Sequence, residues 1–289
     1  AELASYLVGK RMLLVLDNWE HLVEAAPTVL DALLQGATLH VMATSRVRLM
    51  VEGERIVQLE GLPRSEAYTL FVERARRVVP TFATNGDGPA QAEILAICDQ
   101  VAGLPLGIEL AASWVEHYSV AEIGQGIGEI AIQPRQADAL LARHHRLSNV
   151  FEFSWQLLNA RQQQILTHIS VFRGGFDRVA ATVVAESALH DLSMLIAHSL
   201  VQRVSAGRYA LHPLIQEFGE AKLEAAHAAS LAAKYADYFL AMLVATPDIA
   251  WKAQLSDDFA NIRHAWQRAT QARASAIIQH AAGAFAEFV

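Results

Sequence analysis

The sequence predicts an α/β unit followed by a mostly helical chain. Two continuous apolar runs that end in polar residues, at 12–17 and 38–46, stand on either side of a helical stretch. Beyond about residue 62, apolar residues recur at helical spacing and one hairpin signal interrupts them. We therefore expect a small parallel sheet near the start of the sequence and helices through most of the remainder.

The composition is that of a folded protein. A chain of 289 residues with 53% hydrophobic content can fill the cores of two or more domains. A formal net charge of −7 gives no general basic field for a nucleic-acid backbone. The one cysteine, Cys98, excludes an internal disulfide framework and fits a reducing compartment. Since no apolar run approaches the length of a membrane span and no cleavable signal precedes the first strand, we expect a cytoplasmic protein without membrane contact.

The first 59 residues have the pattern of a strand–helix–strand crossover. The two apolar runs are continuous, as expected of strands covered on both faces of a parallel sheet. Between them lies a predicted helix that Gly36 can close. Its apolar side comprises Leu22, Ala26, Val29, Leu30 and Leu33. The stretch "ERIVQL" at 54–59 predicts a third strand.

Helices follow from residue 63, and Ser65 is expected to cap the first of them. Its apolar stripe comprises Ala67, Leu70, Phe71, Ala75 and Val78. A second helix at 89–102 ends at Gly103, and Pro105 begins a third. That third helix carries Leu106, Leu110 and Trp114. The glycine-spaced stretch "EIGQGIGEI" predicts a loop or a frayed helix end.

From about residue 146 the pattern is helices, then a hairpin, then more helices. The helices are expected at 148–158, 160–170, 177–186 and 189–198. Two short strands around Ala206-Gly207 follow, and helices followed by a hairpin are typical of a winged helix. Two facing helices are then predicted from Tyr235, Tyr238, Phe239 and Met242 and from Phe259, Ile262 and Trp266. Such a pair is expected at the start of a helical repeat array.

Polar residues after the first strand are candidates for chemistry. Asp17 ends that strand, where its carboxylate would face the crevice that holds nucleotide phosphates and magnesium in sheets of this class. The alternative is a strand-end aspartate that caps the next helix. Asn18 follows and cannot act as a base, so Glu20 or a residue from elsewhere would have to polarise an attacking water.

Further polar candidates follow the second strand and two helix corners. Thr44, Ser45 and Arg46 supply two hydroxyls and a guanidinium that could hydrogen-bond a terminal phosphate, and a loop with a solvated arginine is the alternative. "GLPLG" at 103–107 indicates a helix–helix corner, and His212 fits a polar residue at a turn. Neither an H-E-x-x-H pattern nor a G-x-S-x-G elbow occurs.

These 289 residues contain no phosphate-binding loop of the G-x-x-x-x-G-K-[ST] type. The Gly9-Lys10 pair is followed by Arg11, and Ala4 occupies the position of the first glycine. Since backbone amides and a lysine normally hold the phosphates, we expect nucleotide binding by this chain to be weak or absent.

Five motifs, taken in order, resemble one family. They are "LLVLDNWEHL", "ATSR", "GLPLGIELAAS", "FEFSWQLLNARQQQILTHISVFRGGF" and "RYALHPLIQEFGEAKL". Together they resemble the STAND class of signal-transduction ATPases, in the branch of large bacterial transcriptional regulators related to the NB-ARC switches. The resemblance covers nearly the whole chain.

The resemblance implies four domains. They are the later part of a P-loop NTPase domain at 1–62, a helical domain at 63–145, a winged helix at 146–222 and the start of tetratricopeptide-like repeats at 223–289. It also implies that the family's phosphate loop, with the strand that carries it, would lie upstream of these residues. In the family's sheet that strand lies between the sensor strand and the final strand, so the strand at 54–59 would lack a neighbour here. We therefore expect 12–17 and 39–44 to pair while 54–59 is displaced or exposed.

The resemblance implies roles for four site residues. Asp17 would be the Walker B acid on the magnesium side, and Arg46 would reach the terminal phosphate. Pro105 would pack near the adenosine, and His212 would touch the diphosphate in the resting state. The family's aspartate after that histidine is Pro213 here. ATP or ADP with magnesium would be the cofactor of a full-length ATPase.

Three functions follow from these observations. In a nucleotide-controlled switch, ADP would hold a closed form, ATP would release it for self-association and signalling, and slow hydrolysis would reset it. In a nucleotide-independent scaffold, protein partners or an inducer would bind the C-terminal helices. Direct DNA binding is disfavoured because "LHDLSMLIAHSL" has no lysine or arginine and the hairpin offers only Arg203 and Arg208.

Overall fold

The computed structural model forms two compact units, Ala1–Leu59 and Glu60–Val289. It describes all residues except 1–5, 8–9, 18, 35–37, 46, 84–88, 132–138, 245–254, 272–277, 280, 284 and 286–289. The four-way division at 62, 145 and 222 stays a prediction.

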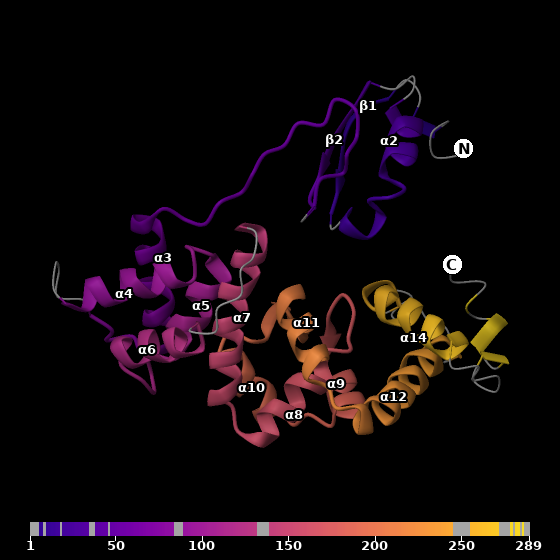
Figure 1. Ribbon diagram of the computed structural model, residues 1–289. Coiled ribbons are helices and arrows are strands. Elements are labelled where there is room, and N and C mark those ends of the chain that lie inside the picture. Colours follow the sequence, from indigo (N-terminus) through magenta and orange to yellow (C-terminus); the bar gives the residue numbers. More distant parts are fainter. Residues whose placement is uncertain are drawn as a thin grey trace. The chain divides into compact units, whose positions relative to one another are not determined.

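The first unit is built on two parallel strands. β1 (Arg11–Leu16) pairs with β2 (Thr38–Ala43), with Leu14 opposite Val41. Helix α2 (Ala26–Leu34) covers one face of this sheet (Figure 1), and its Leu30 and Leu33 are buried against the strands. The predicted pairing of the two strands is confirmed.

The other face of the same sheet carries exposed apolar side chains. Leu13, Val15 and Met42 are 55%, 59% and 56% exposed. The expectation that both faces are covered is therefore wrong for this unit, although continuous apolar strands normally lie under two layers. The predicted third strand is also wrong: residues 54–59 form no strand, and Val57 is 80% exposed. Its exposure agrees with the expectation that this segment has no neighbour to pair with.

The helix between the strands is shorter than predicted. A 3₁₀ turn, η1 (Trp19–Leu22), precedes α2, and Leu22 and Val29 are exposed. Pro27 explains the difference: it lacks a backbone N–H and fits only the first turn of a helix, so the helix has to begin beside it.

Within the described residues, the second unit begins with five helices. They are α3 (Arg64–Val78), α4 (Pro89–Gln100), α5 (Pro105–Ser113), α6 (Val120–Ala131) and α7 (Ala139–Leu157). In α3 the predicted stripe packs inward through Ala67, Phe71 and Ala75. The predicted cap at Ser65 is wrong, because α3 begins after Pro63 and Ser65 lies inside its first turn. There the carbonyl of Ser65 accepts a hydrogen bond from Thr69 Oγ1 at 2.9 Å.

The stretch predicted to be a loop or a frayed helix end, "EIGQGIGEI", is the interior of α6. Ser119 begins this helix in a capping arrangement with Glu122, whose carboxylate accepts bonds from the Ser119 N–H and hydroxyl at 2.8 and 2.7 Å. The glycines let neighbouring elements come close: a Cβ at Gly126 would stand 2.3 Å from the ring of Phe153. Tertiary packing thus outweighs the low helix propensity of glycine.

A three-stranded antiparallel sheet lies among the next four helices. These are α8 (Ala160–Ile169), α9 (Arg178–Ala185), α10 (Leu189–Ala197) and α11 (Pro213–Lys222). The sheet has the order β3–β5–β4, from Phe176–Asp177, Arg208–Ala210 and Gln202–Ser205. Gly207, with a φ of 79°, turns the β4–β5 hairpin, which confirms the predicted hairpin.

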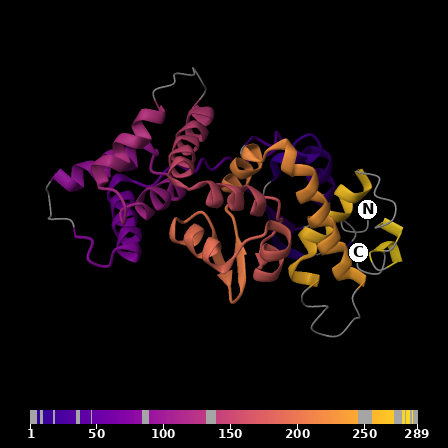
Figure 2. The same ribbon diagram turned by 90° about the horizontal axis from the view of Figure 1, so that it is seen from below.

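Two long helices follow and pack side by side. They are α12 (Ala225–Val244) and α14 (Phe259–Gln271), and Figure 2 shows them together. Tyr235, Phe239 and Ile262 are fully buried between and beneath them. The predicted pair of facing helices is confirmed, whereas a repeat array stays a prediction.

None of the described helices alone is long and apolar enough to cross a membrane. Helices α9 and α10, which meet at 107°, reach that length and composition only when they are combined.

An aromatic stack joins the first five helices to the sheet-bearing region. Trp114, at the end of α5, lies against His198, at the end of α10, with ring centroids 3.9 Å apart and planes 13° apart. The indole N–H of Trp114 donates to Ser154 Oγ at 3.2 Å. His198 is 4% exposed, and within the described residues its Nδ1 has no hydrogen-bond partner.

A matched pair of glycine substitutions tests the packing of α6. We expect Gly126→Ala to lower the free energy of unfolding by about 1–3 kcal/mol, because the new methyl group overlaps the buried Phe153 ring. Gly128→Ala should raise it by about 0.5–1 kcal/mol, since its Cβ would meet only Gln100 Nε2 at 3.5 Å and alanine is the better helix former. Denaturant unfolding of both variants measures the difference. Equal effects would argue against helical packing here.

His198 should make stability depend on pH. Burial, reinforced by His117 and opposed by Glu116, lowers the pKa of His198 from 6.5 to about 4. Between these values the unfolded chain binds a proton that the folded chain does not, so stability falls as the pH falls, by about 1.4 kcal/mol per pH unit.

His198→Phe isolates this effect, because it keeps a ring against Trp114 but cannot titrate. The free energy of unfolding, measured from pH 7 to pH 5, should fall more steeply for wild type than for the variant. Parallel curves would contradict the assignment.

Candidate functional site

Two candidate residues meet at the carboxyl ends of β1 and β2. Thr44 Oγ1 donates to Asp17 Oδ1 at 2.5 Å, and both residues are exposed. The backbone fixes this contact: Thr44 N–H donates to Leu16 O and Trp19 N–H donates to Thr44 O, each at 2.9 Å. Parallel strands end at the same edge of a sheet, which explains why residues 27 apart in sequence lie together.

The other candidates near this edge are described only in part. Ser45 is exposed, and its Oγ accepts a bond from the Val47 N–H at 3.3 Å, as at the start of a loop. Glu20 lies in η1, but its side chain is outside the described part of the structure. Asn18 and Arg46 lie outside the described residues altogether.

The Asp17–Thr44 pair fits one kind of magnesium site. Within the described residues, no group of three or more His, Cys, Asp or Glu side chains could hold a metal ion. Magnesium, however, is commonly held by one or two carboxylates with the remaining ligands from water and substrate phosphates. A single carboxylate beside a hydroxyl suits that mode and would not hold magnesium in the absence of phosphates.

The "GLPLG" corner is a close backbone contact in the second unit. Gly103 has a φ of +66°, and its carbonyl accepts a bond from the Leu62 N–H at 2.8 Å. A Cβ at Gly61 would stand 1.9 Å from Ala102 O, so any side chain there would clash with backbone. Pro105 is exposed and begins α5. The corner interpretation is therefore correct, and any contact of Pro105 with an adenosine stays a prediction.

His212 was predicted only to be a polar residue at a turn, and the structure gives it a defined structural role. It is the N-cap of α11, where its Nδ1 accepts a bond from the Leu214 N–H at 3.2 Å. Pro213 follows at the first helical position, where its fixed φ suits a helix start. Pro105 and His212 thus lie in the second unit, and Asp17 and Thr44 lie together in the first.

Similar proteins are known, although no protein-family model matches the chain. It is 31% identical over 254 residues to a Mycobacterium tuberculosis protein named "Putative HTH-type transcriptional regulator". This alignment covers 83% of this chain and 28% of that protein. It is 28% identical over 231 residues to the regulatory protein AfsR of Streptomyces griseus, covering 76% and 22% respectively. The chain thus spans roughly a quarter of the length of these two relatives.

A solved structure has a similar fold. The STAND protein with a tetratricopeptide repeat sensor from Pyrococcus horikoshii aligns with a TM-score of 0.54 and 18% identity, over 90% of this chain and 33% of that one. The expected broad class is therefore supported at the level of fold: a mostly helical chain with STAND-like architecture. The partial P-loop sheet and the winged helix stay predictions.

Sequence reasoning missed a second polar cluster, centred on Asn261 of α14. Asn261 is 0% exposed, and Asp258, one turn earlier, is 1% exposed. Asn261 lies on the buried side of α14 with Ile262, and Asp258 is buried just before the helix begins at Phe259. Two polar residues three positions apart on an apolar side are the signal that could have revealed the cluster, because buried polar groups need partners.

The N-cap role of His212 can be tested separately from any ligand. His212→Ala removes the acceptor for the Leu214 N–H and should lower the free energy of unfolding by about 0.5–2 kcal/mol. His212→Asn, which offers a good capping oxygen, should recover most of that loss. Urea unfolding of the three proteins measures both changes, and a wild-type value for His212→Ala would rule out the cap.

Proposed function

We propose that this chain is part of a nucleotide-controlled switch in a transcriptional regulator. ADP would favour a closed form, and ATP would favour a form that self-associates and signals. The observation that carries the proposal is the Asp17–Thr44 contact at the carboxyl edge of a parallel sheet, the edge at which α/β proteins bind nucleotides. Similarity to regulators and to the fold of a STAND protein supports it.

The residues have separate roles in this proposal. Asp17 would hold magnesium, whose charge offsets that of the phosphates, and Thr44 orients the carboxylate by hydrogen bonding to one of its oxygens. Ser45 and Arg46 would contact the terminal phosphate, and Glu20, rather than Asn18, would act on the attacking water. The chain contains no G-x-x-x-x-G-K-[ST] sequence, so residues outside it would have to bind most of the phosphate oxygens.

In the second unit, Pro105 would lie near the adenosine and His212 near the diphosphate of the resting form. His212 already accepts the Leu214 N–H through Nδ1. A ligand recognised by this imidazole would therefore act at a side chain that already holds the start of α11. In this way, nucleotide would be linked to the start of α11.

An interaction scaffold is the second candidate, and the packing of α12 and α14 favours it. The Arg208–Asp258 pair holds the start of α14 to β5, and Asn261 of α14 binds the loop before β3; these bonds involve no residue of the first unit. Protein partners or an inducer could bind them without nucleotide. Direct DNA binding is less well supported, because Arg208, one of the two hairpin arginines, is paired with Asp258 at 3.0 Å.

Calorimetry with ADP and ATP in magnesium tests the switch. We expect binding by the full-length protein that the gene encodes, and much weaker or no binding by the 289-residue chain. Asp17→Ala in the full-length protein should weaken magnesium-dependent binding by about 10–100-fold, the effect of losing a charged contact. Asp31→Ala, at an exposed position of α2 in the same unit, is the matched control and should bind like wild type.

The outcomes separate the two candidates. Loss of affinity in Asp17→Ala alone supports the switch. If the full-length protein binds no nucleotide, or binds it equally well without Asp17, the switch proposal fails and the scaffold becomes the better account.

A further inference from the structure

Asn261 uses all the hydrogen-bonding capacity of its side chain. Its Oδ1 accepts from the Arg173 N–H at 2.6 Å and from the Tyr235 hydroxyl at 2.9 Å. Its Nδ2 donates to Gly175 O at 2.7 Å and to Asp258 Oδ1 at 3.1 Å. An asparagine amide has two donor hydrogens and two acceptor sites, so this buried side chain is satisfied by protein groups alone.

Two of these bonds hold a loop. Residues 172–175 lie in the connection between α8 and β3, and Asn261 binds the backbone of this loop at Arg173 and Gly175. Gly175 has a φ of +98°, and a Cβ there would stand 2.9 Å from Tyr209 O. The loop therefore takes a backbone path that a side chain at this position would obstruct, and Asn261 fixes that path from α14.

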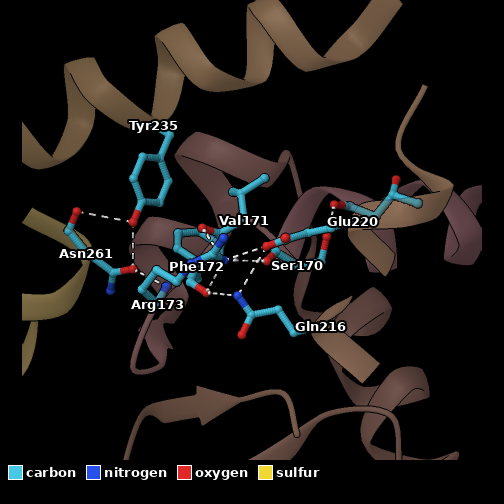
Figure 3. A network of polar contacts seen from close by, with 9 residues as sticks. Ser170, Val171, Phe172, Arg173, Gln216, Glu220, Tyr235 and Asn261 are labelled. Atoms are coloured by element: carbon cyan, nitrogen blue, oxygen red, sulfur yellow. Dashed lines mark hydrogen bonds and ion pairs between the residues drawn. The ribbon is translucent and has the colours of Figure 1, made fainter. Parts of the chain in front are cut away.

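The same loop is bound to α11 from its other side. Arg173 Nη1 pairs with Glu220 Oε1 at 2.6 Å and also donates to Ser170 O at 3.1 Å. Gln216 Nε2 donates to Phe172 O at 2.9 Å. Figure 3 shows these residues converging on the loop, with Asn261 and Tyr235 on one side and Gln216 and Glu220 on the other. The hydrogen bonds of the Asn261 side chain go to the loop, to α12 and to Asp258, and none goes to α11.

A second contact fixes the start of α14. Arg208 of β5 pairs with Asp258 at 3.0 Å and donates to Asp257 O at 3.0 Å. The Asp258 side chain is 2% exposed, so removal of either partner would leave a buried charge without its counterpart. Because Asp258 Oδ1 also accepts from Asn261, the two contacts form one network.

We propose that Asn261 couples the α12–α14 helix pair to α11 through the 172–175 loop. A buried polar network is strongly favoured when it is complete and costly when it is partly broken. A displacement of α14 therefore carries the loop with it, and Arg173 and Gln216 transmit the displacement to α11. A partner that moves the C-terminal helices would in this way alter α11, whose N-cap is His212. The coupling needs no nucleotide and holds whether or not the switch proposal is correct.

Hydrogen–deuterium exchange of the 289-residue chain without nucleotide tests the coupling. In Asn261→Ala, the amides of α11 should exchange about tenfold faster than in wild type, although Asn261 binds none of them. Tyr235→Phe, which removes one hydroxyl without leaving a large cavity, should give a smaller increase at the same amides and remains informative if Asn261→Ala does not fold. Gln267→Ala, an amide truncation at an exposed position of α14, should match wild type.

Reciprocity provides the second arm, because a coupling between two sites acts in both directions. Glu220→Ala removes the ion pair with Arg173 and should speed exchange in α14, while strands β1 and β2 of the first unit stay unchanged. The proposal is overturned if Asn261→Ala and Tyr235→Phe affect only α12, α14 and the loop, or if Glu220→Ala leaves α14 as in wild type. Either result would reduce Asn261 to a local packing residue.

Discussion

A fully buried amide has to satisfy two donors and two acceptor sites inside the protein, and the C-terminal half of the structure depends on how Asn261 meets that requirement. Its partners come from the 172–175 loop, from α12 and from Asp258 just before α14, and the loop in turn binds α11. Apolar contacts alone, such as the stacking of Phe172 on Phe176 at 4.6 Å, would bury surface without fixing direction. The polar network specifies one arrangement of these elements, and it is what would make their movements dependent on one another.

Close backbone approach is the second constraint, and it explains where the sequence misleads. Gly103 and Gly126 are both helix-weakening residues by propensity. Gly103 follows a helix at a tight corner, as predicted, whereas Gly126 lies inside α6 against the Phe153 ring. Propensity describes an isolated helix, whereas packing decides whether a missing side chain is a weakness or a requirement. Pro27 is the opposite case, because its effect is local: it lacks an N–H, and a closer reading of it would have predicted the start of α2.

Features of the fold and the site that depend on residues close together in the sequence could be predicted, and features that depend on distant residues could not. The runs at β1 and β2, the hairpin at Gly207 and the apolar sides of α12 and α14 are encoded by neighbouring residues, and each was predicted. Asp17 and Thr44 were each predicted at the carboxyl end of a strand, and they meet because parallel strands share an edge; the contact itself was not predicted. The Asn261 network was not predicted either, since Arg173 and Asn261 are 88 residues apart and nothing local in the sequence connects them. The third strand failed for a related reason: a strand at 54–59 needs a partner, and its own alternation of residues cannot supply one.

The two units therefore place different demands on an experiment. The Asn261 network of the second unit is complete within the chain, so its coupling can be measured on the 289 residues alone. In the first unit the sheet leaves Leu13, Val15 and Met42 exposed on one face, although parallel sheets are normally covered on both. Asp17 and Thr44 lie at the edge of that sheet, and their geometry depends on the strands that carry them. A nucleotide measurement on the 289-residue chain would for this reason test the site and the short sheet beneath it together.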